Sequence, residues 1–147
     1  MLKRDQLKAI LQNIIHEPTQ FPSEKNVAYL TVNRIGKIGT AGSLDFGGSE
    51  YSEGKIDWID PEKRMEDDKY GWWELPQGLY RIEFNEGVKL EDGGILLQIW
   101  NAALKNGVIH PTEIITESQN PLFTHIHVSE NGVHIKENAR LSEVRLI

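Results

Sequence analysis

The chain has 147 residues, a formal net charge of −6 and no cysteine. A chain of this length is expected to form one domain that buries roughly 68–70% of its unfolded surface, so it needs no covalent crosslink. The lack of cysteine excludes disulfides and thiolate metal sites. No run is apolar enough to span a membrane, no signal peptide precedes the first charges, and no Lys/Arg cluster forms a basic stripe. These features predict a soluble, cytoplasmic protein that binds neither membranes nor nucleic acid.

The first segment, residues 3–15, is predicted to form a helix because its apolar residues recur at helical spacing. They form one stripe that consists of Leu7, Ile10, Leu11 and Ile14. Such a stripe usually docks on the core of its own domain, and binding of a partner is the alternative. Residues 16–25 are polar, carry two prolines and are predicted to be a loop.

The next stretch combines a short apolar segment with glycines and charges. Val27–Val32 is predicted to be a strand, whereas three glycines in residues 33–42 predict turns. Residues 49–70 are dominated by charge, and Pro61–Lys69 within them is predicted to be a solvated loop.

After residue 70 the sequence alternates between short strand-like runs and turn residues. In Leu79–Phe84, the side chains of Tyr80, Ile82 and Phe84 share one face of the predicted strand. The other predicted strands are Tyr70–Leu75, Val88–Leu90, Ile95–Trp100, Thr112–Thr116, Leu122–Val128, Val133–Lys136 and Arg140–Ile147. Strands at this spacing, each closed by turn residues, predict an all-β sandwich or barrel.

These elements predict a single domain. No internal repeat, low-complexity segment or linker divides residues 1–147. The expected organisation is an N-terminal helix and loop at residues 1–20 and a β domain at residues 26–147.

The segment that organises the C-terminal half is Gly93–Gly107. Its run Ile95–Trp100 is apolar apart from Gln98, which suits a strand buried on both faces. The small residues that follow, Asn101–Gly107, predict a turn or a short helix. Taken alone, these observations predict a core strand followed by a surface turn.

Three histidines are expected to share one face of a hairpin formed by residues 122–136. His125 and His127 are two apart on one predicted strand, and Asn131-Gly132 predicts a tight turn that brings His134 to the same face. A two-residue turn places His134 diagonal to His127, and a four-residue loop places it opposite. These histidines are therefore candidates for a zinc site. The alternative is that they face water or lie half-buried at a subunit contact.

Three segments follow one another in a characteristic order and spacing. They are W-W-E-L-P-Q-G-L-Y-R-I from residue 72, the segment Gly93–Gly107, and N-A-R-L-S-E-V-R-L-I at residues 138–147. In that order they resemble the dUTPase and dCTP deaminase superfamily, and Ser43–Gly48 is similar to the family's first motif, which forms a strand. The resemblance covers roughly residues 39–147. It implies an all-β, β-clip fold, a homotrimer with nucleotide sites between subunits, a deoxynucleotide ligand, and Mg²⁺ carried by the triphosphate.

The second motif of the family is altered in this chain. The resemblance implies that its arginine and serines hold phosphate oxygens through charge-assisted and hydroxyl hydrogen bonds. Where that motif reads Pro-Arg-Ser-Ser, residues 99–102 read I-W-N-A, so Trp100 stands at the arginine position. Asn101 keeps a polar group and Lys105 lies nearby. Asn101, Ala102 and Lys105 are thus candidates for nucleotide binding.

The third motif, an Asp followed three residues later by a Tyr, is altered too. The resemblance implies that this Asp positions and deprotonates the attacking water. Here the Asp position holds Thr116 and the Tyr position holds Gln119, which are further nucleotide-binding candidates. Glu113 or Glu117 is the alternative base if the loop shifts by a residue or more, so these two are the catalytic candidates.

Three functions are compatible with these residues. The first is a homotrimeric, dUTPase-related protein that binds a nucleotide or has a structural role, with reduced or lost catalysis. The second is an active dUTP diphosphatase or deaminase that uses substituted residues, and the third is an unrelated β-sandwich binding module. The losses in the second and third motifs favour the first function over the second. The agreement in order and spacing favours both over the third.

Overall fold

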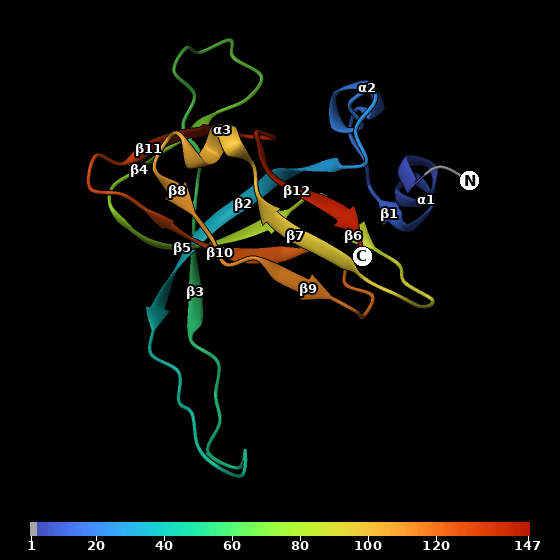
Figure 1. The fold of residues 1–147 in the computed structure, drawn as a ribbon. Coiled ribbons are helices and arrows are strands. Elements are labelled where there is room, and N and C mark those ends of the chain that lie inside the picture. The colour runs from blue at the N-terminus through green and yellow to red at the C-terminus, as the bar shows by residue number, and fades with distance from the viewer. Residues whose placement is uncertain (1–2) are drawn as a thin grey trace.

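The computed structural model describes residues 3–147 as a curled, mostly β body with a long two-stranded arm (Figure 1). The helices are α1 (Lys3–Ile10), α2 (Glu17–Gln20) and α3 (Asn101–Leu104). The strands are β1 (Leu11–Gln12), β2 (Ala28–Thr40), β3 (Lys55–Ile59), β4 (Trp72–Leu75), β5 (Gly78–Phe84), β6 (Gly87–Val88), β7 (Ile95–Ile99), β8 (Val108–Ile109), β9 (Glu113–Ile115), β10 (Phe123–Val128), β11 (Val133–Lys136) and β12 (Arg140–Leu146). The fold class predicted from the sequence is confirmed.

Most of the strands belong to one antiparallel sheet. Its order is β8-β10-β5-β2-β12-β7-β9, and β3 pairs with the outer part of β2. Two smaller sheets pair β1 with β6 and β11 with β4. The central neighbours of the large sheet, β10-β5-β2-β12-β7, come from distant parts of the chain, so its middle is held by long-range pairing.

The core follows the alternation predicted for β5. Tyr80, Ile82 and Phe84 are all buried, as expected. In β7 the side chains of Ile95 and Leu97 are fully buried, but the residues between and after them are half-buried. The predicted burial on both faces is thus complete on one face of β7 and only partial on the other.

The N-terminal helix is shorter than predicted and ends at Ile10. Leu11 and Gln12 leave the helix because they pair with β6, and the backbone N–H of Lys89 donates to the Ile10 carbonyl at 2.9 Å. Leu7 and Leu11 are buried in the same core as the strands, so the apolar stripe docks on the domain itself. No helix within residues 3–147 is long and apolar enough to cross a membrane.

The prediction of turns in residues 33–42 is wrong, because β2 continues through them to Thr40 and pairs with β3 as an arm. Figure 1 shows this arm projecting from the body. Gly36 serves close strand contact: a Cβ there would lie 2.6 Å from Cγ2 of Ile56 and 2.9 Å from Cε3 of Trp58. The strand β3 also corrects the prediction that residues 49–70 are all loop, although Pro61–Lys69 is an exposed loop as predicted.

The strand predicted at Ser43–Gly48 is wrong as well. This segment forms the tip of the arm, where the Asp45 carboxylate accepts backbone N–H bonds from Gly48 at 3.0 Å and Glu50 at 2.8 Å. Because these two backbone N–H groups donate to the Asp45 side chain and not to a neighbouring strand, the segment forms a loop. As a result, Leu44 and Phe46 are almost fully exposed.

The hairpin predicted over residues 122–136 is also wrong. A turn does occur, because the Gly132 N–H donates to the Ser129 carbonyl at 2.9 Å. However, β10 pairs with β5 and β8, whereas β11 pairs with β4. The two strands therefore diverge after the turn instead of pairing with each other.

Candidate functional site

The small-residue segment after β7 folds as α3, in agreement with the prediction of a turn or short helix. Ala103 packs into the core, whereas Asn101 and Lys105 are exposed. The ring of Trp100 lies 5.1 Å from that of Tyr29, and the Arg140 guanidinium lies 4.5 Å from the Trp100 ring centroid. The position expected to hold a phosphate-binding arginine thus carries an aromatic ring that packs against its neighbours.

The candidates from the third motif lie at the other end of β7. Thr116 lies beside the start of β7, because a Cβ atom added to Gly94 would be 3.3 Å from Cγ2 of Thr116. Asn101 lies just past the other end of β7. At about 3.3 Å per strand residue, Thr116 and Asn101 are roughly 20 Å apart. Gln119 is held to the backbone of Val88. Within one chain, the two groups of nucleotide-binding candidates are not brought together.

The two catalytic candidates have different surroundings. Glu113 is half-buried on β9 and accepts a hydrogen bond from the Thr124 hydroxyl at 3.1 Å. Thr124 is buried, so this contact ties β9 to β10. Glu117 is exposed in the loop after β9. Of the two, Glu113 is the carboxylate whose position is fixed.

The three candidate metal ligands are not gathered into one site. His125 is half-buried beside Arg81 on β5, His127 is exposed, and His134 pairs with Glu74 in the separate β4–β11 sheet. In the part of the chain that the structure describes, no group of three His, Cys, Asp or Glu side chains is placed to hold a metal ion. The cause is the divergence of β10 and β11, on whose pairing the predicted cluster depended.

A histidine contact that sequence reasoning missed joins His110 to Ser142. Nδ1 of His110 lies 2.8 Å from the Pro111 carbonyl oxygen, and Nε2 lies 2.7 Å from the Ser142 hydroxyl. Burial lowers the pKa of His110, which favours the neutral ring that donates through Nδ1 and accepts through Nε2. Ser142 is fully buried, so this pair is a structural contact and the hydroxyl is closed to substrate. The two residues are far apart in sequence, and no local pattern signals their contact.

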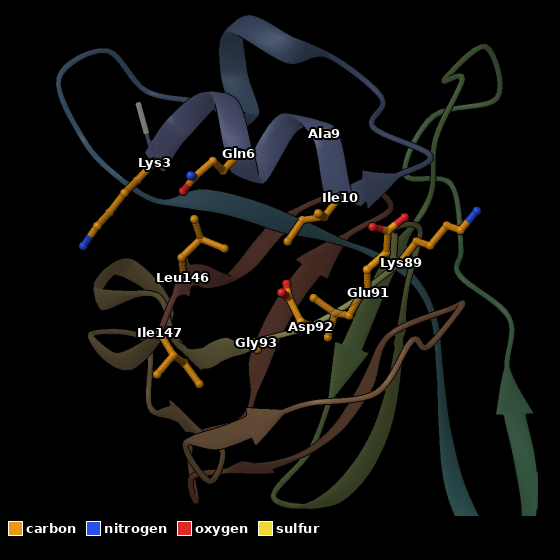
Figure 2. A pocket seen from close by; sticks show the side chains of 12 residues that line it. Lys3, Gln6, Ala9, Ile10, Lys89, Glu91, Asp92, Gly93, Leu146 and Ile147 are labelled. Atoms are coloured by element: carbon orange, nitrogen blue, oxygen red, sulfur yellow. The ribbon is translucent and has the colours of Figure 1, made fainter. Parts of the chain in front are cut away.

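A groove between α1 and the end of β12 is shown in Figure 2. Its volume is about 670 Å³. Side chains of both charges line it, among them Lys89, Glu91 and Asp92, and none of the predicted site residues takes part. Its mixed charge gives no preference for an anionic ligand.

Comparisons with known proteins point to one family. No family model matches the chain. A "Probable deoxyuridine 5'-triphosphate nucleotidohydrolase" of Methanosarcina mazei is 35% identical over 81 residues, covering 55% of this chain and 43% of that protein. Its counterpart in Methanosarcina barkeri is 32% identical over 82 residues, covering 56% of this chain and 43% of that protein. The chain thus matches less than half the length of these curated relatives.

Among solved structures, the 2'-deoxycytidine 5'-triphosphate deaminase of Agrobacterium tumefaciens superposes with a TM-score of 0.70. The superposition covers 99% of this chain and 46% of that protein, at 12% sequence identity. The architecture is therefore the mostly β, dUTPase-like fold. Together with the curated relatives, it shows that the chain is similar to proteins of the dUTPase and dCTP deaminase superfamily.

Proposed function

We propose that this protein is a dUTPase-related homotrimer that binds a deoxynucleotide or has a structural role, with reduced or lost catalysis. The observation that carries the proposal is Trp100, which packs against both Tyr29 and Arg140 where a phosphate-binding arginine is expected. Asn101 and Ala102 replace two hydroxyl side chains beside it. Losing one preorganised donor typically costs about 10²–10³ in rate, and several are missing here.

The separation of the candidate residues supports a trimer. Asn101 and Thr116 lie at opposite ends of β7, so a site that uses both groups needs a second subunit. Large apolar side chains are exposed around the two edges of the sheet: Leu104, Ile109 and Ile114. Exposed apolar residues on edge strands and beside them suit a subunit contact.

An active enzyme is the second candidate, and one observation favours it. Glu113 is a half-buried carboxylate fixed by Thr124, as a general base must be. If the protein is active, Mg²⁺ is proposed to arrive with the triphosphate, as the resemblance implies; if it is inactive, no cofactor is proposed. An unrelated binding module is disfavoured by the similarity in fold and sequence to these proteins.

The test is a turnover and binding screen with dUTP and dCTP in the presence of Mg²⁺, together with light scattering at micromolar concentration. The expected result is a trimer with no measurable release of pyrophosphate or ammonia. Rapid release of pyrophosphate from dUTP contradicts the loss of catalysis. In that case Glu113→Gln and Glu117→Gln identify the base. A monomeric mass contradicts the proposed assembly.

A further inference from the structure

At the base of the arm, the face of the large sheet opposite the core carries a row of side chains from several strands. The register pairs Trp58 with Gly36, Gly36 with Arg81, and Arg81 with His125, across β3, β2, β5 and β10. Directly paired residues of neighbouring strands lie on the same face. The core residues of β5 alternate with Arg81, so Trp58, Arg81 and His125 all lie on the face away from the core.

This face and the arm together form a groove of about 790 Å³, which we call the arm groove. Its apolar and aromatic lining comes from both parts: Ile38, Leu44, Tyr51, Ile56, Trp58 and Phe123. Three of these side chains, Ile38, Leu44 and Tyr51, are each more than half exposed. Exposed apolar side chains that gather on one surface mark a binding site for another molecule.

The base of the arm groove carries two arginines that share one carboxylate. The Arg34 guanidinium stacks 3.6 Å from the Trp58 ring centroid, and its Nε lies 2.9 Å from Oε1 of Glu83. The Arg81 guanidinium lies 3.9 Å from the Phe123 ring centroid. Its Nη2 is 3.8 Å from Oε2 of Glu83, which is too long for a hydrogen bond. The base of the groove therefore carries one more positive than negative charge, beside two aromatic rings.

The tip of the arm, residues 41–54, has the complementary character. It carries three carboxylates, Asp45, Glu50 and Glu53, and it contains no Lys or Arg. Figure 1 shows the tip well away from the body. Phe46 lies at this tip, fully exposed and outside the arm groove of its own chain. One chain thus presents both an acidic tip with an aromatic ring and a positively charged, aromatic groove.

We propose that the tip of the arm docks in the arm groove of a neighbouring copy of this chain. Phe46 of one subunit packs against Trp58 and Phe123 of the next, and Glu50 lies near Arg81 there. A contact between two different surfaces repeats head to tail and can close into a ring. The inference rests on the proposed trimer and names a contact that would build it. None of the nucleotide-binding or catalytic candidates lines the arm groove.

Cysteine crosslinking tests this contact, because the chain has no cysteine of its own. In Gly47→Cys/His125→Cys, the first cysteine is at the tip, where a Cβ meets no atom within 4 Å, and the second lies in the arm groove. The arm spans about 13 Å from Gly36 to Thr40 alone, which exceeds the Cα separation of about 7 Å that a disulfide can bridge. A disulfide between the two cysteines therefore joins different chains. Oxidation is expected to give covalent trimers on a denaturing gel. The controls are the two single variants and Gly47→Cys/Glu91→Cys, whose second cysteine lies beside α1, and they are expected to stay uncrosslinked.

Changes at the tip separate the apolar from the charged part of the contact. Phe46→Ser in the double-cysteine variant is expected to lower the crosslinked fraction about 10-fold or more, whereas Phe46→Leu should retain most of it. Glu50→Lys should lower this fraction more at low salt than at high salt. Circular dichroism spectra check that each variant is folded, and Phe46 and Glu50 are exposed positions in the single chain.

The outcomes distinguish this contact from the proposed trimer. A double-cysteine variant that is trimeric by light scattering but does not crosslink overturns the inference and leaves the trimer standing. Equal crosslinking in the Glu91→Cys control also overturns the inference. Covalent dimers with a dimeric mass support the contact between tip and groove and contradict the trimer. Uncrosslinked monomers contradict both.

Discussion

Thr31 binds both oxygens of the fully buried Glu86 carboxylate. Its backbone N–H lies 2.8 Å from Oε1, and its hydroxyl lies 2.5 Å from Oε2. The side-chain amide of Gln20 adds a third bond to Oε2 at 2.8 Å and also donates to the Tyr29 carbonyl. This carboxylate therefore joins α2, β2 and the start of β6, and the contact is part of the architecture.

Glu86→Ala is expected to destabilise the fold because it leaves the buried donors of Thr31 and Gln20 without an acceptor. An unsatisfied buried group costs about 1–3 kcal/mol, so the loss should be at least in that range. Urea denaturation measures the free energy of unfolding. Glu91→Ala, at an exposed position, serves as the control and should change it by less than about 0.5 kcal/mol. Equal stability of Glu86→Ala and the wild type would contradict this role.

The same residue predicts a pH dependence. Burial raises the pKa of Glu86 above its ordinary value of 4.5, against the opposing hydrogen bonds from Thr31 and Gln20. Protonation therefore favours the folded state. The contribution to stability is fully present below about pH 4.5 and is lost as the pH rises through the folded-state pKa. Glu86→Gln removes the charge, so its stability relative to the wild type should increase with pH across this window. If the difference in stability between Glu86→Gln and the wild type did not change with pH, Glu86 would not have the raised pKa.

His110 predicts the opposite dependence of stability on pH. Its pKa is lowered by burial, although the Pro111 carbonyl and Glu113 oppose the shift. Neutral His110 contributes stability above the unfolded value of 6.5, and that contribution is lost as the pH falls through the folded-state pKa. His110→Ala should therefore flatten the decline in stability on acidification. It should also cost about 1–3 kcal/mol at pH 8, because Ser142 loses its partner. The exposed His127→Ala is the control and should change the free energy of unfolding at pH 8 by less than about 0.5 kcal/mol.

The close contact at the base of the arm predicts a steric effect. In Gly36→Ala the new methyl group would lie within 2.9 Å of the Asp57 carbonyl oxygen and closer still to Ile56. Overpacking of this kind typically costs about 1–3 kcal/mol. Thermal denaturation should show a lower midpoint for Gly36→Ala and little change for Gly47→Ala, whose Cβ meets no atom within 4 Å. Similar denaturation midpoints for the two variants would mean that β3 moves away from the new methyl group without loss of stability.

The elements that the sequence predicts well are those with a local signal. In β5 the alternation of Tyr80, Ile82 and Phe84 reports burial directly, because it depends only on the strand period. The small residues after Ile99 predict α3 for a similar reason. Gly36 contributed to the wrong prediction of turns, because the sequence does not distinguish a glycine that permits close strand contact from one that permits a turn.

Partner choice between strands is the part that the sequence does not reveal. Asn131-Gly132 marks a real turn, but whether β10 and β11 pair depends on β5 and β4, which lie far away in the chain. The same limit applies to the candidate site. Asn101 and Thr116 are only a short stretch of sequence apart, and the antiparallel course of β7 and β9 places them at opposite ends. The contact of His110 with Ser142 likewise exists only once β12 is in place.

The position of β12 has a consequence for how the chain is made. This strand follows all the others in the sequence, yet it lies inside the sheet, between β2 and β7. During synthesis from the N-terminus, β2 and β7 emerge with one edge each unpaired and must wait for β12 to join them. Sheets that depend on such distant segments assemble slowly, and their open edges attract other chains. A nascent chain arrested before residue 140 should therefore depend on holding chaperones more strongly than one released after β12.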